Sequence, residues 1–169
     1  MGIFDSITAD PLQQLLTALG CFQRELARAE EGVERDHWFP PASEQIQLAE
    51  GIAREQRWGE LSRTLGDLVR LMEAFDRAEI LDSGLPLLKA AYETLCLMVG
   101  DQIVGKKTTH VVKQWDRLYE NAAETLANAG VELAGRPARP IGCVGSDEMS
   151  TGHARRGFLS VLRRIFGSG

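Results

Sequence analysis

The sequence has few of the residues that build metal centres or disulfide frameworks. It holds three cysteines and three histidines in 169 residues. The cysteines, Cys21, Cys96 and Cys143, are far apart and form no C-x-x-C pair, which argues against a zinc site and against a disulfide framework. We therefore expect a reduced, cytoplasmic chain that binds no metal and no cofactor.

Long hydrophobic runs are also missing. No apolar run reaches the roughly 18 residues that a membrane-spanning helix needs. The N-terminus lacks the basic region and the long apolar region of a secretory signal. These absences predict a protein that does not span a membrane, although a peripheral contact with a membrane stays open.

Basic residues are outnumbered in most of the chain. The net charge is −5, yet the last sixteen residues carry four arginines and no acidic residue. These arginines give the tail a charge of +4 and leave −9 for the remainder. Nucleic-acid binding needs a basic face, so we expect no specific binding to nucleic acid.

Apolar residues make up 44% of the chain, which is enough for a full core. They recur at spacings of three and four residues, the pattern of amphipathic helices. This pattern predicts an all-α fold, a bundle of about five helices. The first expected helix begins at Asp10-Pro11, with Asp10 as its cap, and closes before Gly32. The second is capped by Ser43 and runs to about Gln56, and the third runs from about Glu60 to Glu79. The fourth follows the stripe from Leu88 to Val99 after a restart at Pro86. The fifth runs from its cap, Thr108 or Thr109, to Ala129, with Gly130 as a C-terminal cap.

The segment from Arg35 to Ala42 is predicted to be a turn, because two consecutive prolines, Pro40 and Pro41, disfavour a helix. Trp38 lies in this segment. It is a candidate contact for a partner, and the alternative is that it caps the end of the bundle. In the same way, the glycines at 100 and 105 predict a break between the fourth and fifth helices.

Composition divides the chain into four parts. Residues 1–9 form an N-terminal leader, and residues 10–133 form the helical bundle. Residues 134–152 are rich in Gly, Pro and Ser, which is typical of a flexible linker. Residues 153–167 form the fourth part, a cationic amphipathic helix.

This terminal segment is the clearest interaction signal in the sequence. On a helix at about 100° per residue, its apolar side chains fill one arc and most of its arginines lie outside that arc. We expect it to dock on a membrane surface, a groove of a protein partner, a protein shell, or the acidic end of the first helix at Glu30, Glu31, Glu34 and Asp36. The docking residues are Arg155, Arg156, Phe158, Leu159, Leu162, Arg163, Arg164, Ile165 and Phe166.

No residue cluster points to catalysis. None of His37, His110 and His153 has a second metal ligand at helical spacing, and no E-x-x-H pair suggests a di-iron bundle. The glycines near Gly142 lack the lysine of a phosphate-binding loop. The sequence therefore predicts a non-enzymatic binding or adaptor protein, and amphipathic helices of this length leave a homodimer open.

Three stretches together resemble one known family. Leu68 to Ala78 (LVRLMEAFDRA) resembles the "vLDxlDRAl" helix of GrpE-type nucleotide exchange factors. The stretch from Trp115 to Glu132, ending LANAGVE, resembles their "LxxxGVE" helix end. Arg139-Pro140-Ile141-Gly142, with Asp147 and Met149, is similar to the loop that follows.

The resemblance covers about half of the chain, from roughly residue 60 to 150. It implies a helical dimerisation and docking body related to a cochaperone of an Hsp70 chaperone. The Phe-Asp-Pro element of the family is replaced by Gly145-Ser146-Asp147. The β domain that follows in the family has no counterpart, since the basic tail stands in its place. The resemblance identifies no catalytic residue, and the alternative function that it implies is a divergent GrpE-like cochaperone that binds an Hsp70.

Overall fold

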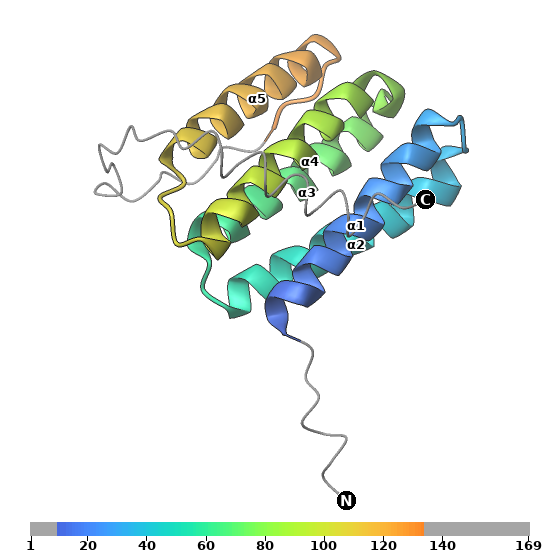
Figure 1. Cartoon of the computed structure of the whole chain (residues 1–169). Coiled ribbons are helices and arrows are strands. Elements are labelled where there is room, and N and C mark those ends of the chain that lie inside the picture. Colours follow the sequence, from blue (N-terminus) through green and yellow to red (C-terminus); the bar gives the residue numbers. More distant parts are fainter. Residues whose placement is uncertain (1–9, 134–169) are drawn as a thin grey trace, which may run out of the picture. The chain divides into compact units, whose positions relative to one another are not determined.

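The structure is a computed structural model that describes residues 10–133 (Figure 1). This part of the chain contains five α-helices and no strand, so the predictions of an all-α fold and of five helices are confirmed for these residues. The predicted leader, linker and C-terminal helix lie outside the described residues. The helices are α1 (Pro11–Glu30), α2 (Arg35–Glu55), α3 (Gly59–Arg77), α4 (Leu81–Ile103) and α5 (Thr109–Asn128).

The chain divides into two compact units, and the division falls inside α3, between Gly66 and Asp67. In the first unit, α1 and α2 pack side by side as a helical hairpin (Figure 1). Leu15, Leu19 and Phe22 of α1 are fully buried, as are the smaller Ala42 and Ala49 of α2. These residues recur at helical spacing, so one face of each helix is withdrawn from water and stabilises the hairpin.

In the second unit, α4 packs against α5, and the C-terminal half of α3 contributes Leu68, Met72 and Phe75 to the buried side chains. Trp115 of α5 is completely buried. Gly84 of α4 faces the ring of Phe75, and a Cβ atom at position 84 would lie 2.8 Å from Cδ1 of that ring. Only glycine therefore allows α4 to lie at its present distance from Phe75.

The predicted turn from Arg35 to Ala42 is wrong, because α2 begins at Arg35 and continues through Pro40 and Pro41. Both prolines lie near the start of the helix, where the two N–H groups that they lack would have paired with the carbonyls of Asp36 and His37. Those two residues are exposed, so water can satisfy their carbonyls.

Burial of Trp38 and Phe39, which are 2% and 7% exposed, offsets the missing hydrogen bonds. A fully buried aromatic side chain stabilises by about 1.5–3 kcal/mol, against about 0.5–1.5 kcal/mol for each backbone hydrogen bond. Trp38 is therefore a core residue, which contradicts its prediction as a partner contact. The expected cap, Ser43, lies inside α2, where its hydroxyl accepts a hydrogen bond from the amide of Gln47 over 3.1 Å.

The fourth helix is also longer than predicted. It starts at Leu81, passes through Pro86 and Gly100, and ends at Ile103. Gly100 does not interrupt it, because a single glycine costs only about 1 kcal/mol in a helix and the neighbouring Met98, Val99 and Asp101 are buried. The predicted break is confined to residues 104–108.

All five described helices end in the same way, in a Schellman motif. The residue after the C-cap (position C′) adopts a positive φ, and the next residue (position C″) donates its N–H to a carbonyl five residues earlier. Glycine fills C′ at Gly32, Gly105 and Gly130, as predicted for Gly130, with φ of 87°, 68° and 84°. Arg57 and Glu79 fill the other two C′ positions, with φ of 59° and 56°.

Of the predicted N-terminal caps at Asp10 and Thr108, one makes a capping hydrogen bond and the other does not. The carboxylate of Asp10 accepts a hydrogen bond from the N–H of Leu12 over 3.2 Å, which confirms the predicted cap. Thr108 occupies the N-cap position of α5, but its side chain makes no capping hydrogen bond.

Candidate functional site

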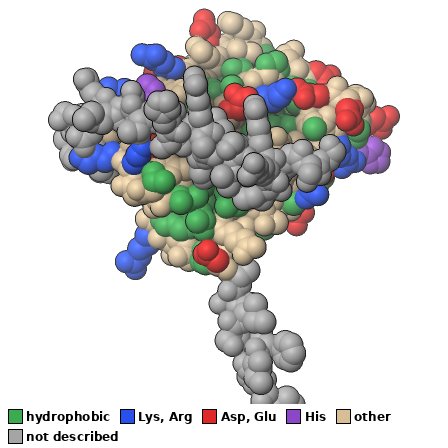
Figure 2. Space-filling view, in the orientation of Figure 1, with side chains coloured by type: hydrophobic (Ala, Val, Ile, Leu, Met, Phe, Trp, Pro, Cys, Tyr) green, Lys and Arg blue, Asp and Glu red, His purple; other side chains and the backbone are tan. Residues whose placement is uncertain are grey.

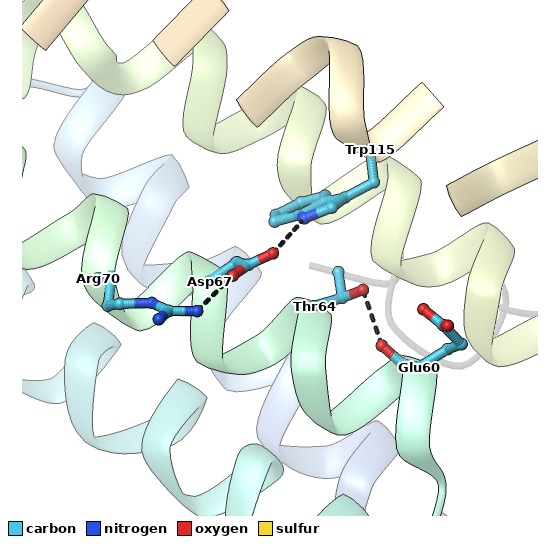
Figure 3. A network of polar contacts seen from close by, with 5 residues as sticks. All are labelled: Glu60, Thr64, Asp67, Arg70 and Trp115. Carbon is cyan, nitrogen blue, oxygen red and sulfur yellow. Dashed lines mark hydrogen bonds and ion pairs between the residues drawn. The ribbon is translucent and has the colours of Figure 1, made fainter. Parts of the chain in front are cut away.

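The most deeply buried charged side chain of the described residues joins α3 to α5 (Figure 3). Asp67 is completely buried. Its Oδ2 accepts a hydrogen bond from Nε1 of Trp115 over 3.0 Å, and its Oδ1 accepts one from the guanidinium of Arg70, one turn further along α3. Both oxygens of the carboxylate therefore have partners within the fold. This arrangement holds the indole and the helix in place, which is a structural task.

Two buried threonine hydroxyls are likewise bonded within the helices that carry them. Thr64 donates to the carbonyl of Glu60 over 2.8 Å (Figure 3), and Thr94 donates to the carbonyl of Ala90 over 2.8 Å. A hydroxyl that bonds to the carbonyl four residues earlier is a common way to bury Ser or Thr in a helix. These two hydroxyls are therefore part of the backbone hydrogen bonding of α3 and α4.

Cys96 of α4 is the one buried thiol of the described residues. Burial raises its pKa to about 11; the hydrogen bond with Tyr92 acts in the opposite direction, and the charge of Glu93 raises the pKa further. Burial also raises the pKa of the Tyr92 hydroxyl. Because the thiolate is the nucleophilic form, a thiol with so high a pKa is a poor nucleophile at neutral pH.

The histidine and acidic side chains of the described residues are not grouped as metal ligands. Between residues 10 and 133, no group of three or more His, Cys, Asp or Glu side chains could hold a metal ion. His110 is exposed in the first turn of α5. His37 is exposed in the first turn of α2, where its Nε2 lies 4.0 Å from a carboxylate oxygen of Glu34.

The predicted docking residues, from Arg155 to Phe166, all lie outside the described residues. Their proposed acidic counterpart is described. Glu30, Glu31, Glu34 and Asp36 are all exposed, at the connection between α1 and α2. Two of them have basic neighbours, since Asp36 pairs with Arg35 over 2.8 Å and Glu34 approaches His37. At least one of these four carboxylates, that of Asp36, is therefore paired within its own helix.

Sequence reasoning missed a second exposed cluster, at the connection between α4 and α5. We define this basic apolar tip by Ile103, Val104, Lys106 and Lys107. The two aliphatic side chains are 43% and 56% exposed, and both lysines are exposed. A signal was present in the sequence: three of its four lysines fall between residues 106 and 113. The tip was missed because the glycines beside it indicated only a break.

Within residues 10–133, no helix combines the length and the apolar character needed to cross a membrane. Neither the scan against protein-family models nor the searches of curated proteins and of solved structures found a match.

Proposed function

We propose that this chain is a non-enzymatic helical binding protein that docks through residues 153–167. The observation that carries the proposal is the composition of this segment, which places six apolar side chains and four arginines beside an otherwise acidic chain. The described residues support it, because the buried carboxylate of Asp67 and the buried hydroxyls of Thr64 and Thr94 all bond within the fold.

The size of the expected interaction suits reversible docking. Six apolar side chains contribute on the order of 5 kcal/mol after ordering costs, at about 1.5–3 kcal/mol for each fully buried side chain. On an anionic membrane, each arginine adds roughly 1 kcal/mol. An anionic membrane surface is therefore the first docking target, and a groove on a protein partner is the alternative.

The test is co-sedimentation of the full chain with vesicles that contain phosphatidylserine. Leu162→Asp puts a charge in the middle of the apolar arc, and we expect it to abolish the part of the binding that residues 153–167 provide. Ser160→Asp is the matched control, because it adds the same charge on the polar side of the same helix. We expect this control to keep most of the binding and both variants to keep the thermal unfolding of the parent chain.

Equal pelleting of the Leu162→Asp variant and the parent chain would show that the segment does not dock on membranes. A large loss of melting temperature in that variant would instead mean that the segment is part of the core. If the parent chain does not bind vesicles, a pull-down with the same two variants tests docking in a groove of a protein partner.

A second candidate function is a divergent GrpE-like cochaperone. It is supported by the placement of two of the three similar stretches, since Leu68 to Arg77 lies on α3 and Trp115 to Asn128 lies on α5. The helix end that resembles LxxxGVE closes with Gly130 at a φ of 84°. Release of a labelled ADP analogue from the cognate Hsp70 tests this function, and no acceleration at micromolar protein would remove it.

A further inference from the structure

The five helix ends share one geometry, and four of them share one chemistry. In a Schellman motif the residue at C″ is commonly apolar, because it folds back onto the last turns of the helix. Four of the five ends follow this rule, and the apolar residue is half-buried in each case. These residues are Val33, Trp58, Ile80 and Val131.

The fifth end, that of α4, inverts the pattern. Its C″ residue is Lys106, which is exposed and donates its N–H to the carbonyl of Asp101 over 2.9 Å. The last helical residue and the C-cap are Ile103 and Val104, and both are exposed. At the other four ends these two positions hold polar residues or alanine, namely Glu30 and Glu31, Glu55 and Gln56, Arg77 and Ala78, and Asn128 and Ala129.

The inversion leaves branched aliphatic side chains in water where the same backbone geometry elsewhere exposes polar ones. Ile103 is 43% exposed and Val104 is 56% exposed. A local rule that is broken without a gain in packing is expected at functional positions. Contact with an external apolar phase would withdraw these two side chains from water and remove the free-energy cost of exposing them.

The charge around the two aliphatic residues is positive. Residues 106–113 contain Lys106, Lys107 and Lys113 and no acidic residue, in a chain of net charge −5. The exposed His110 lies among them. Figure 2 shows basic and hydrophobic side chains on the left of the molecule, where Figure 1 places the connection between α4 and α5.

We infer that the basic apolar tip is a contact site for an anionic lipid surface. Ile103 and Val104 enter the boundary between headgroups and acyl chains, and the lysines lie against the anionic headgroups, with their aliphatic stems along the same apolar layer. The tip lies at the connection between two helices, α4 and α5, that pack against each other. An acidic chain needs such a local basic site to approach an anionic surface.

The inference goes beyond the proposed function and does not depend on residues 153–167. The two are separated by working in the full chain that carries Leu162→Asp, which removes docking by the terminal segment. Two double variants are then compared with this background: Ile103→Ser with Val104→Ser, and Lys106→Gln with Lys107→Gln. The probes are vesicles of phosphatidylcholine with and without phosphatidylserine.

We expect the serine pair and the glutamine pair each to weaken partitioning to phosphatidylserine vesicles by about tenfold or more. The chain offers matched controls outside the tip. Besides Ile103 and Val104, residues 10–133 have one other exposed large hydrophobic residue, Leu48, whose side chain is 52% exposed, and Leu48→Ser alters it. Lys89→Gln alters the one lysine outside residues 106–113. We expect both controls to bind within about twofold of the background, since electrostatic attraction falls off within a Debye length of the surface.

Several outcomes overturn the inference. One is tip variants that bind like the controls; another is a Leu162→Asp chain that binds no vesicles. Loss of binding in the glutamine pair but not in the serine pair would mean simple charge attraction without apolar contact. Circular dichroism checks folding, and the glutamine pair, whose side chains are exposed, keeps the test valid if the serine pair unfolds. Failure of Leu162→Asp to weaken the parent chain would remove the proposed function and leave the tip untouched.

Discussion

The indole of Trp115 on α5 donates a hydrogen bond to the carboxylate of Asp67 on α3 over 3.0 Å, and both side chains are completely buried. This is a bond between residues 48 positions apart in the chain. It gives α3 a fixed register against α5 in the second unit, because neither group has water to replace its partner.

Trp115→Phe tests this bond. The change keeps most of the buried ring but removes the donor, so Oδ2 of Asp67 loses its hydrogen bond from the indole. We expect the free energy of unfolding to fall by about 1–3 kcal/mol. Urea unfolding followed by circular dichroism measures it. Trp58→Phe, at a half-buried tryptophan, is the control and should cost less; equal losses in the two variants would contradict a special role for the bond.

Gly84→Ala tests the close approach of α4 to Phe75. The added Cβ would lie 2.8 Å from a ring that is completely buried, so the ring or the helix must shift. Overpacking of this kind costs about 1–3 kcal/mol. Gly51→Ala is the matched control, because its Cβ meets nothing within 4 Å inside α2, and it should stabilise by about 0.5–1 kcal/mol.

The cause of the Gly84→Ala effect can be checked by a double change. Phe75→Leu removes the ring that the new methyl group meets, so the two changes together should cost less than the sum of the single changes. Strictly additive losses would show that Phe75 is not what limits position 84.

Two helix ends are predicted to gain stability from glycine. Arg57 and Glu79 adopt the left-handed conformation, with φ near 60°, which costs a non-glycine residue roughly 1–2 kcal/mol. Arg57→Gly and Glu79→Gly should each raise the free energy of unfolding by about 0.5–1 kcal/mol, after the entropy that glycine adds to the unfolded chain. The reverse change, Gly130→Ala, should destabilise by a similar amount, and a Gly130→Ala variant as stable as the parent would contradict the argument.

Stability should fall in alkaline solution because of Cys96. Its pKa is about 11 in the fold against an ordinary 9.0, so between these values the unfolded chain loses the proton while the folded chain keeps it. The contribution is present below pH 9 and is lost as the pH rises toward 11, by about 3 kcal/mol in all. Tyr92 acts in the same direction, since burial raises its pKa as well.

Urea midpoints of the parent chain and of Cys96→Ala, measured at pH 8 and near pH 10.5, check this prediction. The alanine variant should be less stable at pH 8 and should lose less stability at the higher pH. Cys21→Ser is the control and should follow the parent chain. An identical pH slope in Cys96→Ala and the parent would show that the thiol does not carry the effect.

The number of helices could be predicted from the sequence because their signals are local. Asp10 at the first cap and Gly130 at the last helix end each act within a few residues, and the structure confirms both. The starts of α2 and α4 could not be predicted in this way. Pro40, Pro41 and Pro86 oppose a helix locally. In α2 the prolines are overridden by burial of the neighbouring Trp38 and Phe39, which spacing alone does not reveal.

The two candidate contact sites differ in the same way. The terminal segment could be recognised from the sequence because its arginines and its apolar residues are concentrated in sixteen positions. The basic apolar tip is not, since exposure of Ile103 and Val104 depends on where α4 ends, and the glycines at 100 and 105 gave the wrong end. The contrast between this helix end and the other four is visible only once their hydrogen bonds are known.

The division between the two units falls between Gly66 and Asp67, in the middle of an unbroken helix. Truncation at that point would leave Leu61 and Leu65 on one fragment and Leu68, Met72 and Phe75 on the other, each at the frayed end of a half-length helix. A helix shared in this way transmits melting from one half to the other. Heating should therefore produce a single calorimetric transition, and a protease that cuts within α3 should release no stable fragment.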